Sequence, residues 1–220
     1  MSWDNYADGW DRDEAVRTYS RAAFDRLTRI CGERGIRLEG ARICDFGCGT
    51  GLLTEKLAPV CSDVVAVDTS VRMLDQLRGK IERLGLSNVR TTSEAVTHGG
   101  LREDALLGLP FDLIVCSSVC GFLDDYPGTV GTLVRLLGPG GLFVQFDWEP
   151  DPHSQEPFGL NRDQVKQTLS DSGLEAIEVE TAFEVSTGDQ TMRPLMGVGQ
   201  APSLDWEPGN SGNTSMDSQG

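Results

Sequence analysis

Two kinds of segment are missing from this chain of 220 residues. No stretch approaches the roughly 18 consecutive apolar residues that a membrane-spanning helix needs. The polar start, residues 1–5, also lacks the positively charged and then apolar sequence of a secretory signal peptide. We therefore expect a cytoplasmic protein with no membrane partner.

Histidine is scarce, and the cysteines show no metal-binding pattern. The two histidines are His98 and His153, and the six cysteines form no Cys-x-x-Cys pair. Most of the cysteines lie in or beside expected core strands, where a reduced thiol behaves as a small apolar side chain. We expect no metal site and no disulfide framework.

Positive charge is also in short supply. Lys and Arg number 19 against 34 Asp and Glu, which gives a formal net charge of −15 and a pI near 4.4. Such a surface repels a phosphate backbone, so nucleic acid is excluded as an expected substrate. With 39% hydrophobic and 24% charged residues, the length suits one globular domain with a single substantial core.

A glycine-rich stretch at residues 41–51 organises the rest of the chain. An apolar run with one acid, Asp45, breaks into glycines at alternate positions, Gly47, Gly49 and Gly51, before an amphipathic segment begins. Glycine permits positive φ and lets a ligand lie against the backbone, and the helix that follows offers unpaired N–H groups. The pattern predicts a strand, a tight turn and a helix that hold a nucleotide-like cofactor.

The spacing of these glycines disfavours a dinucleotide. The dinucleotide pattern is Gly-x-Gly-x-x-Gly, whereas here the third glycine comes one residue early. An acid two residues before Gly47 instead resembles motif I of the class I S-adenosylmethionine (SAM) dependent methyltransferases. A second apolar strand at residues 64–67 ends in Asp68, whose carboxylate can accept both ribose hydroxyls.

Three later segments resemble the same family in the same order. They are the segment after the second strand (68–74), the fourth strand (111–115) and the turn with the fifth strand (136–144). The resemblance implies an α/β three-layer sandwich with a Rossmann-like, seven-stranded, mostly parallel sheet and an antiparallel C-terminal hairpin strand. We expect strands at 43–46, 64–67, 89–92, 111–117, 142–146, 178–186 and 191–199.

Helical periodicity and turn residues predict the remaining elements. One or two helices precede the first strand, and four more are expected at 52–57, 72–84, 130–137 and 161–170. The chain then divides into an N-terminal helical segment or lid (1–40), a SAM-binding methyltransferase domain (41–200) and a disordered tail rich in Gly, Ser, Asn and Pro (201–220).

The resemblance also assigns the cofactor contacts. Asp68 would bind the ribose, Met73 and Glu94 the adenine, and Ser117 the methionine part. Plainer roles compete with these: Asp45 could only brace the turn, Asp68 could only cap a helix, and Met73 could only be core. The full set of expected cofactor residues is Asp45, Gly47, Cys48, Gly49, Gly51, Asp68, Thr69, Met73, Glu94 and Ser117.

The catalytic residues are the least determined part of the sequence. Transfer from a sulfonium needs positioning and desolvation more than an acid or base, so the catalytic residues stay unknown. His153 and Asp147 are the catalytic candidates: His153 could act as a base, and Asp147 could shape the substrate pocket or bind a cation, although a loop histidine is more often only solvated. The aromatic residues expected to bind the substrate are Tyr6, Trp10, Tyr19 and Trp148, although packing on the core would explain them as well.

The sequence therefore predicts a SAM-dependent methyltransferase (EC 2.1.1.-) that acts on the O, N or C atom of a small-molecule acceptor, as a monomer or homodimer. Two other functions stay open. A protein or peptide methyltransferase would show an open, negatively charged groove, and a non-catalytic SAM-binding partner protein would bind the cofactor without turnover.

Overall fold

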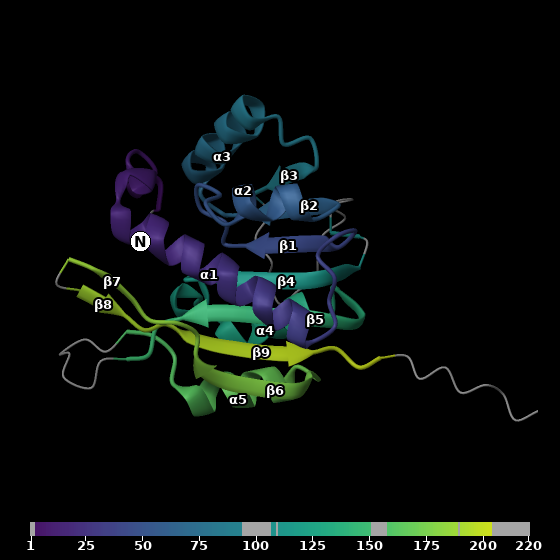
Figure 1. Cartoon of the computed structure of the whole chain (residues 1–220). Helices are drawn as coiled ribbons and strands as arrows, with labels where there is room; N and C mark the ends of the chain where they lie inside the picture. The colour runs from purple at the N-terminus through teal and green to yellow at the C-terminus, as the bar shows by residue number, and fades with distance from the viewer. Residues whose placement is uncertain (1–2, 94–106, 109, 151–157, 189, 204–220) are drawn as a thin grey trace, which may run out of the picture.

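A computed structural model describes residues 3–93, 107–108, 110–150, 158–188 and 190–203, and its centre is one seven-stranded sheet (Figure 1). The strand order is β3-β2-β1-β4-β5-β9-β6, and β9 runs antiparallel to both of its neighbours. The predicted α/β fold with a mostly parallel sheet is confirmed. The strands are β1 (Arg42–Phe46), β2 (Asp63–Val67), β3 (Val89–Thr92), β4 (Phe111–Ser117), β5 (Leu137–Asp147), β6 (Glu175–Thr181) and β9 (Leu195–Gln200).

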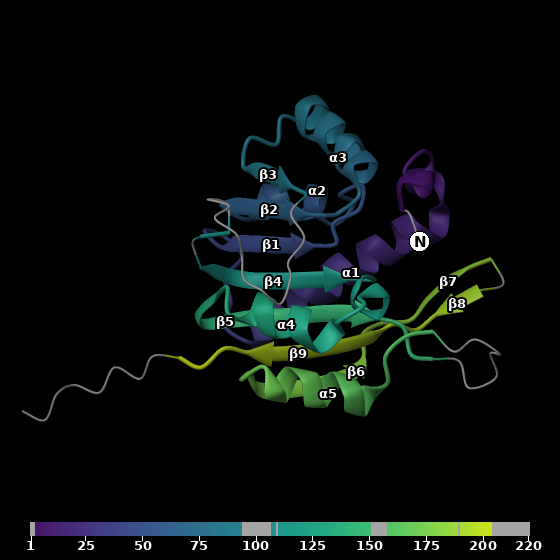
Figure 2. The ribbon, with the colours of Figure 1, turned by 180° about the vertical axis from the view of Figure 1, so that it is seen from behind.

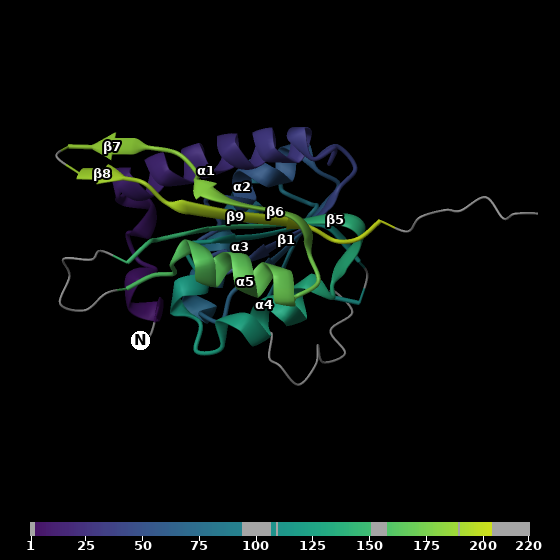
Figure 3. The ribbon, with the colours of Figure 1, turned by 90° about the horizontal axis from the view of Figure 1, so that it is seen from below.

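Helices cover both faces of the sheet, as Figures 2 and 3 show. On one face α1 (Glu14–Glu33), α2 (Thr54–Leu57) and α3 (Val71–Leu84) bury one apolar cluster, to which Leu27, Leu57 and Leu77 belong. On the other face α4 (Tyr126–Val134) and α5 (Arg162–Asp171) bury a second cluster. Burial on both sides explains why the central strands are almost entirely apolar.

Local signals fix the ends of several helices. Ser70 caps α3 by accepting from the backbone N–H of Met73, and Gly85 ends that helix in the left-handed conformation with φ 66°. Asn161 caps α5 through the backbone N–H of Gln164 at 2.8 Å. None of the helices in the described part of the chain combines the length and apolarity to cross a bilayer.

The C-terminal hairpin differs from the prediction. One long hairpin was expected from 178–186 and 191–199, but β6 ends at Thr181, and β7 (Val185–Thr187) pairs only with β8 (Gln190–Met192). The chain returns to the sheet after Pro194, which has no N–H to donate to a ladder. The β7–β8 hairpin therefore projects past the sheet at the end where the N-terminal segment lies (Figure 1).

The turn before the fifth strand also differs from the prediction. The glycines at 138–141 were expected to separate a helix over 130–137 from a strand over 142–146, but β5 already starts at Leu137 and pairs with Phe111. A register shift lets the strand pass through this region. The helix starts earlier, at Tyr126, because Asp125 caps it and Pro127 suits its first turn.

Candidate active site

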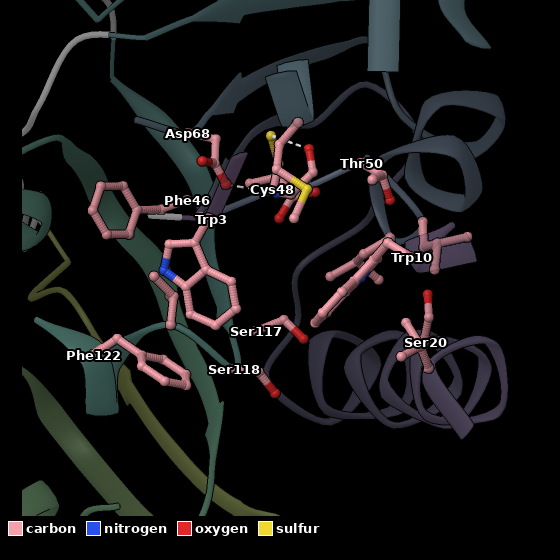
Figure 4. A pocket seen from close by; sticks show the side chains of 18 of the residues that line it. Trp3, Trp10, Ser20, Phe46, Cys48, Thr50, Asp68, Ser117, Ser118 and Phe122 are labelled. Atoms are coloured by element: carbon pink, nitrogen blue, oxygen red, sulfur yellow. Dashed lines mark hydrogen bonds between the residues drawn. The ribbon is translucent and has the colours of Figure 1, made fainter. Parts of the chain in front are cut away.

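A cavity of about 450 Å³ lies at the carboxyl ends of β1, β2 and β4 (Figure 4). In open α/β sheets this edge is where ligands bind. The glycine turn and the end of β2 form one side of the cavity, and the end of β4 and the start of α1 form the other. Trp148, which follows β5, and Met192 of the β7–β8 hairpin complete the wall.

The three glycines of the turn all have positive φ, but their surroundings differ. A Cβ on Gly47 would lie 2.5 Å from Val119 Cγ2, and one on Gly51 would lie 2.3 Å from Leu77 Cδ1. A Cβ on Gly49 would meet nothing within 4 Å, although its φ is 54°. Gly47 and Gly51 are therefore required by close packing, whereas Gly49 leaves open backbone at the cavity.

The carboxylate of Asp68 links the end of β2 to the glycine turn. Its Oδ2 accepts from the backbone N–H of Gly49 and its Oδ1 from that of Ser70, both at 2.8 Å. Burial raises the pKa of Asp68, and the two backbone donors oppose that rise. Each carboxylate oxygen keeps further acceptor capacity, so this group can still receive the hydroxyls of a ribose. The residues present therefore fit a nucleoside cofactor.

The carboxylate of Asp45 is held by a hydroxyl of the helix that follows the turn. It is buried, and its Oδ2 accepts from the Thr54 hydroxyl at 2.5 Å. Burial raises the pKa of Asp45 to about 6, although the hydrogen bond from Thr54 lowers it. Asp45 therefore ties β1 to α2 while it also lines the cavity.

An N-terminal strap, defined as residues 3–12, borders the cavity and is joined to α3 by three acids. Asp4 Oδ1 accepts from Ser70 Oγ at 2.5 Å, and Asp8 Oδ2 lies 2.5 Å from Arg72. Asp11 pairs with Lys80. Because the cationic partners Arg72 and Lys80 lie eight residues apart, they share a face of α3.

Aromatic rings from the strap continue into the cavity wall. Trp3 and Trp10 line the cavity, and the ring of Trp3 meets that of Phe122 edge-on at 4.8 Å. Tyr19 of α1 lies 5.5 Å from Trp148, and its ring also packs edge-on against Phe183. Aromatic pairs of this kind favour fixed ring orientations, so this end of the cavity is a rigid, flat-walled space.

The cavity brings together most of the residues that the sequence singled out. Eight of the expected cofactor residues line it: Asp45, Gly47, Cys48, Gly49, Asp68, Thr69, Met73 and Ser117. Three of the four expected substrate residues do so too: Trp10, Tyr19 and Trp148. Glu94 and His153 lie outside the described residues.

Three expected site residues lie elsewhere. Gly51 packs against Leu77 and does not line the cavity, and Tyr6, which is 45% exposed, does not line it either. Asp147 is buried and accepts from the backbone N–H groups of Cys120 and Gly121, both at 3.0 Å. Burial raises the pKa of Asp147 to about 6, but both of its oxygens are engaged away from the cavity, which supports a structural role.

Other lining residues were not among the expected site residues. They include Trp3, Ser20, Thr50, Ser118, Phe122 and Met192. The sequence carries a signal for Ser20, because helical spacing places it on the same face of α1 as the expected site residue Tyr19. Ala15, Val16, Tyr19 and Ser20 share this face, and all four line the cavity. Trp3 lies seven residues before the expected site residue Trp10, but nothing local in the sequence marks either Trp3 or Met192 as a cavity residue.

The six cysteines of the chain are free thiols, and Cys48 alone lines the cavity. Burial raises the pKa of the Cys48 thiol, which disfavours the reactive thiolate. Within the described ranges no group of three or more His, Cys, Asp or Glu could hold a metal ion.

The doubly covered sheet, the glycine turn and the carboxylate at the next strand end define a Rossmann-like domain built for a nucleoside cofactor. The family follows from sequence comparison, because residues 15–177 match the family model described as a methyltransferase domain. The chain therefore belongs to the class I SAM-dependent methyltransferases, as its motifs predict.

Curated relatives share part of their length with this chain. An uncharacterized methyltransferase of Schizosaccharomyces pombe is 32% identical over 138 residues, 61% of this chain and 46% of that protein. A ubiquinone biosynthesis O-methyltransferase of Roseobacter denitrificans is 35% identical over 160 residues, 67% of this chain and 61% of that protein. The chain thus spans about half the length of the curated relatives it matches.

Solved structures share the fold. The N-methyltransferase NodS from Bradyrhizobium japonicum, in complex with S-adenosylhomocysteine (SAH), aligns with a TM-score of 0.65 at 20% sequence identity. The alignment covers 84% of this chain and 88% of NodS. At this identity the likeness is one of fold.

Proposed function

We propose that this chain transfers a methyl group from SAM to a small-molecule acceptor. The observation that carries the proposal is the place of Asp68. Its carboxylate accepts from the N–H of Gly49 beside open glycine backbone, and both residues line a cavity that also reaches the end of β4. A ribose at Asp68 would direct the rest of the cofactor toward Ser117 and the aromatic end.

The chain's own residues would hold the cofactor at three points. Asp68 would receive the ribose hydroxyls, and buried Met73 would pack against the base. The backbone of the glycine turn would lie along the methionine part, where Gly49 has no side chain to intrude. Glu94, outside the described residues, stays a predicted contact of the adenine amino group.

Bound SAM supplies a methyl group on a positively charged sulfur, so the leaving group is already activated. An electron pair of the acceptor atom would form the new bond to the methyl carbon, and the electrons of the carbon–sulfur bond would leave with the sulfur as SAH. An oxygen or nitrogen acceptor also releases a proton to solvent or to a base. The strap would help by keeping water away, because Trp3 and Trp10 border the cavity.

The lining of the cavity supports a small acceptor over a basic peptide. Its charged side chains among the described residues are Asp45 and Asp68, both on the cofactor side, and the rest is apolar, aromatic or hydroxylated. A peptide methyltransferase would need an open acidic groove. Acceptor atom, oligomeric state and cytoplasmic location stay predictions.

The test is calorimetric titration with SAM, with SAH and with NAD as a control ligand. We expect micromolar binding of the first two and none of NAD. Asp68→Ala should weaken SAH binding on the order of 100-fold, because two hydrogen bonds to a charged group are lost. Asp75→Ala is the matched control, because it removes an exposed acid from α3, where Asp75 pairs with Arg78.

Two outcomes would contradict the proposal. If wild-type protein bound neither SAM nor SAH, the cofactor role of the cavity would be wrong. Tight SAM binding without turnover on a broad panel of small acceptors would favour a non-catalytic SAM-binding protein. Thermal unfolding of Asp68→Ala must accompany the titration, since Asp68 also holds Gly49 and Ser70 in place.

A further inference from the structure

Two neighbouring hydroxyl groups on α1 are buried at the cavity wall. Tyr19 is 9% exposed and Ser20 is 6% exposed, and both line the cavity. Within the part of the chain that the structure describes, neither hydroxyl oxygen makes a hydrogen bond of ordinary geometry, although the Ser117 and Ser118 hydroxyls lie close to that of Tyr19. Buried polar groups are nearly always satisfied by protein or by water, so these two hydroxyls are open to a partner from a bound ligand or from the water that the ligand displaces.

The direction of the Tyr19 hydroxyl is fixed by its neighbours. Its ring lies between Trp148, at 5.5 Å, and Phe183, at 5.4 Å, which leaves the ring little freedom to turn away. Burial raises the pKa of Tyr19 to about 12, and hydrogen bonding to the nearby hydroxyls of Ser118 and Ser117 opposes that rise. Tyr19 therefore stays a neutral donor and acceptor at any ordinary pH.

The end of β4 brings further hydroxyls to the same place. Ser118 adopts φ 56°, a conformation that few residues other than glycine take, and its N–H donates to the Phe146 carbonyl at 2.7 Å. Strained conformations of this kind persist where the surrounding structure enforces them, often at functional sites. Figure 4 shows Ser117 and Ser118 on the cavity side nearest α1, with the Ser20 hydroxyl turned toward Trp10.

Among the described residues, no charged side chain lines this end of the cavity, although the buried Asp147 is close enough to raise the pKa of Tyr19. The charged side chains of the described lining, Asp45 and Asp68, belong to the cofactor side, while Trp10, Trp148 and Met192 wall the α1 side. A charged ligand here would lose its hydration with no charged side chain in contact with it. An uncharged ring with a hydroxyl or amine substituent would satisfy the orphan hydroxyls and stack on the aromatic walls.

We infer that Tyr19 and Ser20 determine acceptor specificity by hydrogen-bonding the polar substituent of an uncharged aromatic acceptor. The inference rests on the proposed function, because it places the acceptor beside the cofactor in the same cavity. Tyr19 and Ser20 are specificity residues in this inference. The methyl transfer itself needs no proton from either of them.

The test uses full-length protein saturated with SAH and four small probes of similar size. Phenol and aniline carry the required substituent, toluene replaces it by a methyl group, and benzoate adds a charge. We expect phenol and aniline to bind several-fold more tightly than toluene or benzoate, as measured by ligand-observed NMR titration. Tyr19→Phe and Ser20→Ala should each reduce that preference by about threefold to tenfold, the value of one hydrogen bond.

Two controls distinguish recognition from structural damage. SAH affinity should be unchanged in both variants, and ligand-free Tyr19→Phe should unfold at the same temperature as the wild type or higher, because it removes an unsatisfied buried group. Thr18→Val removes a hydroxyl from the same helix outside the cavity lining, and it should keep the full preference for phenol. A structural role for Tyr19 would instead lower the unfolding temperature.

Three results would overturn the inference. One is an unchanged preference in Tyr19→Phe and Ser20→Ala, and another is a wild type that favours benzoate or does not discriminate among the probes. In both cases, SAH binding by the wild type would leave the proposed function standing. Absence of SAH binding would overturn the proposed function and this inference together.

Discussion

The carboxylate of Asp11 and the ammonium of Lys80 lie 2.7 Å apart and join the N-terminal strap to α3. The Oδ1 of Asp11 also accepts from the Thr50 hydroxyl at 2.6 Å, inside the glycine turn. The Lys80 side chain is almost fully buried. One acid of the strap therefore contacts both the turn and the helix that border the proposed cofactor site.

Asp11→Asn should loosen the strap. The change leaves Lys80 with only Glu55, at 3.5 Å, as a counter-charge in the described structure, and we expect a loss of about 1–3 kcal/mol in the free energy of unfolding because a buried charge loses its partner. SAH affinity should fall several-fold. Chemical unfolding and calorimetry would measure the two effects.

Asp8→Asn provides the matched control for this change. Asp8 makes the same kind of pair with Arg72, but both side chains are mostly exposed, so less than about 1 kcal/mol should be lost. Equal effects of the two substitutions would show that the Asp11–Lys80 pair has no special role in holding the strap.

Deletion of residues 1–12 should impair binding without unfolding the domain. The deletion removes Trp3 and Trp10 from the cavity wall while the sheet and its two apolar clusters keep their contacts. We expect SAH affinity to fall by about tenfold, as the loss of two aromatic contacts would produce, while the far-UV circular dichroism spectrum stays unchanged. Unchanged affinity and turnover would mean that the strap is no lid.

Alanine substitutions in the glycine turn should separate binding from folding. Gly51→Ala places a Cβ against the buried side chain of Leu77 and forces a left-handed alanine, so about 2–4 kcal/mol of stability should be lost. In Gly49→Ala the new methyl group meets no neighbour. Only the strain of a left-handed alanine applies, so about 1–2 kcal/mol of stability should be lost.

The same two variants should differ in the opposite way in SAH binding. The added methyl group of Gly49→Ala lies where the cofactor would run, so its affinity should fall by about tenfold or more, whereas correctly folded Gly51→Ala should retain most of its affinity. Thermal unfolding and calorimetry on the two proteins would test the contrast. A Gly49→Ala variant that binds SAH normally would place the cofactor elsewhere.

The glycine-turn side of the cavity could be predicted because its signals are local in sequence. Asp45 and the glycines form one short stretch, and Asp68 ends the next strand, so the β-α-β order alone brings them together. The outer wall depends on tertiary packing instead. Phe122 and Met192 line it through contacts between distant segments, and neither position carries a sequence pattern of its own.

The sheet was predictable for a similar reason, and its irregular parts were not. Val64–Val67 and Phe111–Ser117 are short, largely apolar runs typical of strands buried on both faces. The strand β5 starts at Leu137 because this residue pairs with Phe111 across a register shift. In the sequence alone, the Gly-Pro-Gly-Gly segment at 138–141 indicates a turn, so this early start could not be predicted. Separation of β7–β8 from the sheet likewise depends on where the chain leaves β6, not on a local turn signal.

Asp45→Asn should change how stability depends on pH. Burial raises the pKa of Asp45 to about 6, above the roughly 4 of an unfolded aspartate, so its favourable contribution is complete below pH 4 and is lost as the pH rises through 6. The asparagine side chain of the variant keeps an acceptor for Thr54 and does not titrate. Relative to the wild type, the variant should therefore be about 1 kcal/mol more stable at pH 7.5 than at pH 5.

Urea unfolding at both pH values measures this difference in stability. Glu82→Gln changes an exposed acid on α3 and controls for the overall loss of negative charge. An equal stability difference at the two pH values would mean that Asp45 is already ionised in the folded protein at pH 5.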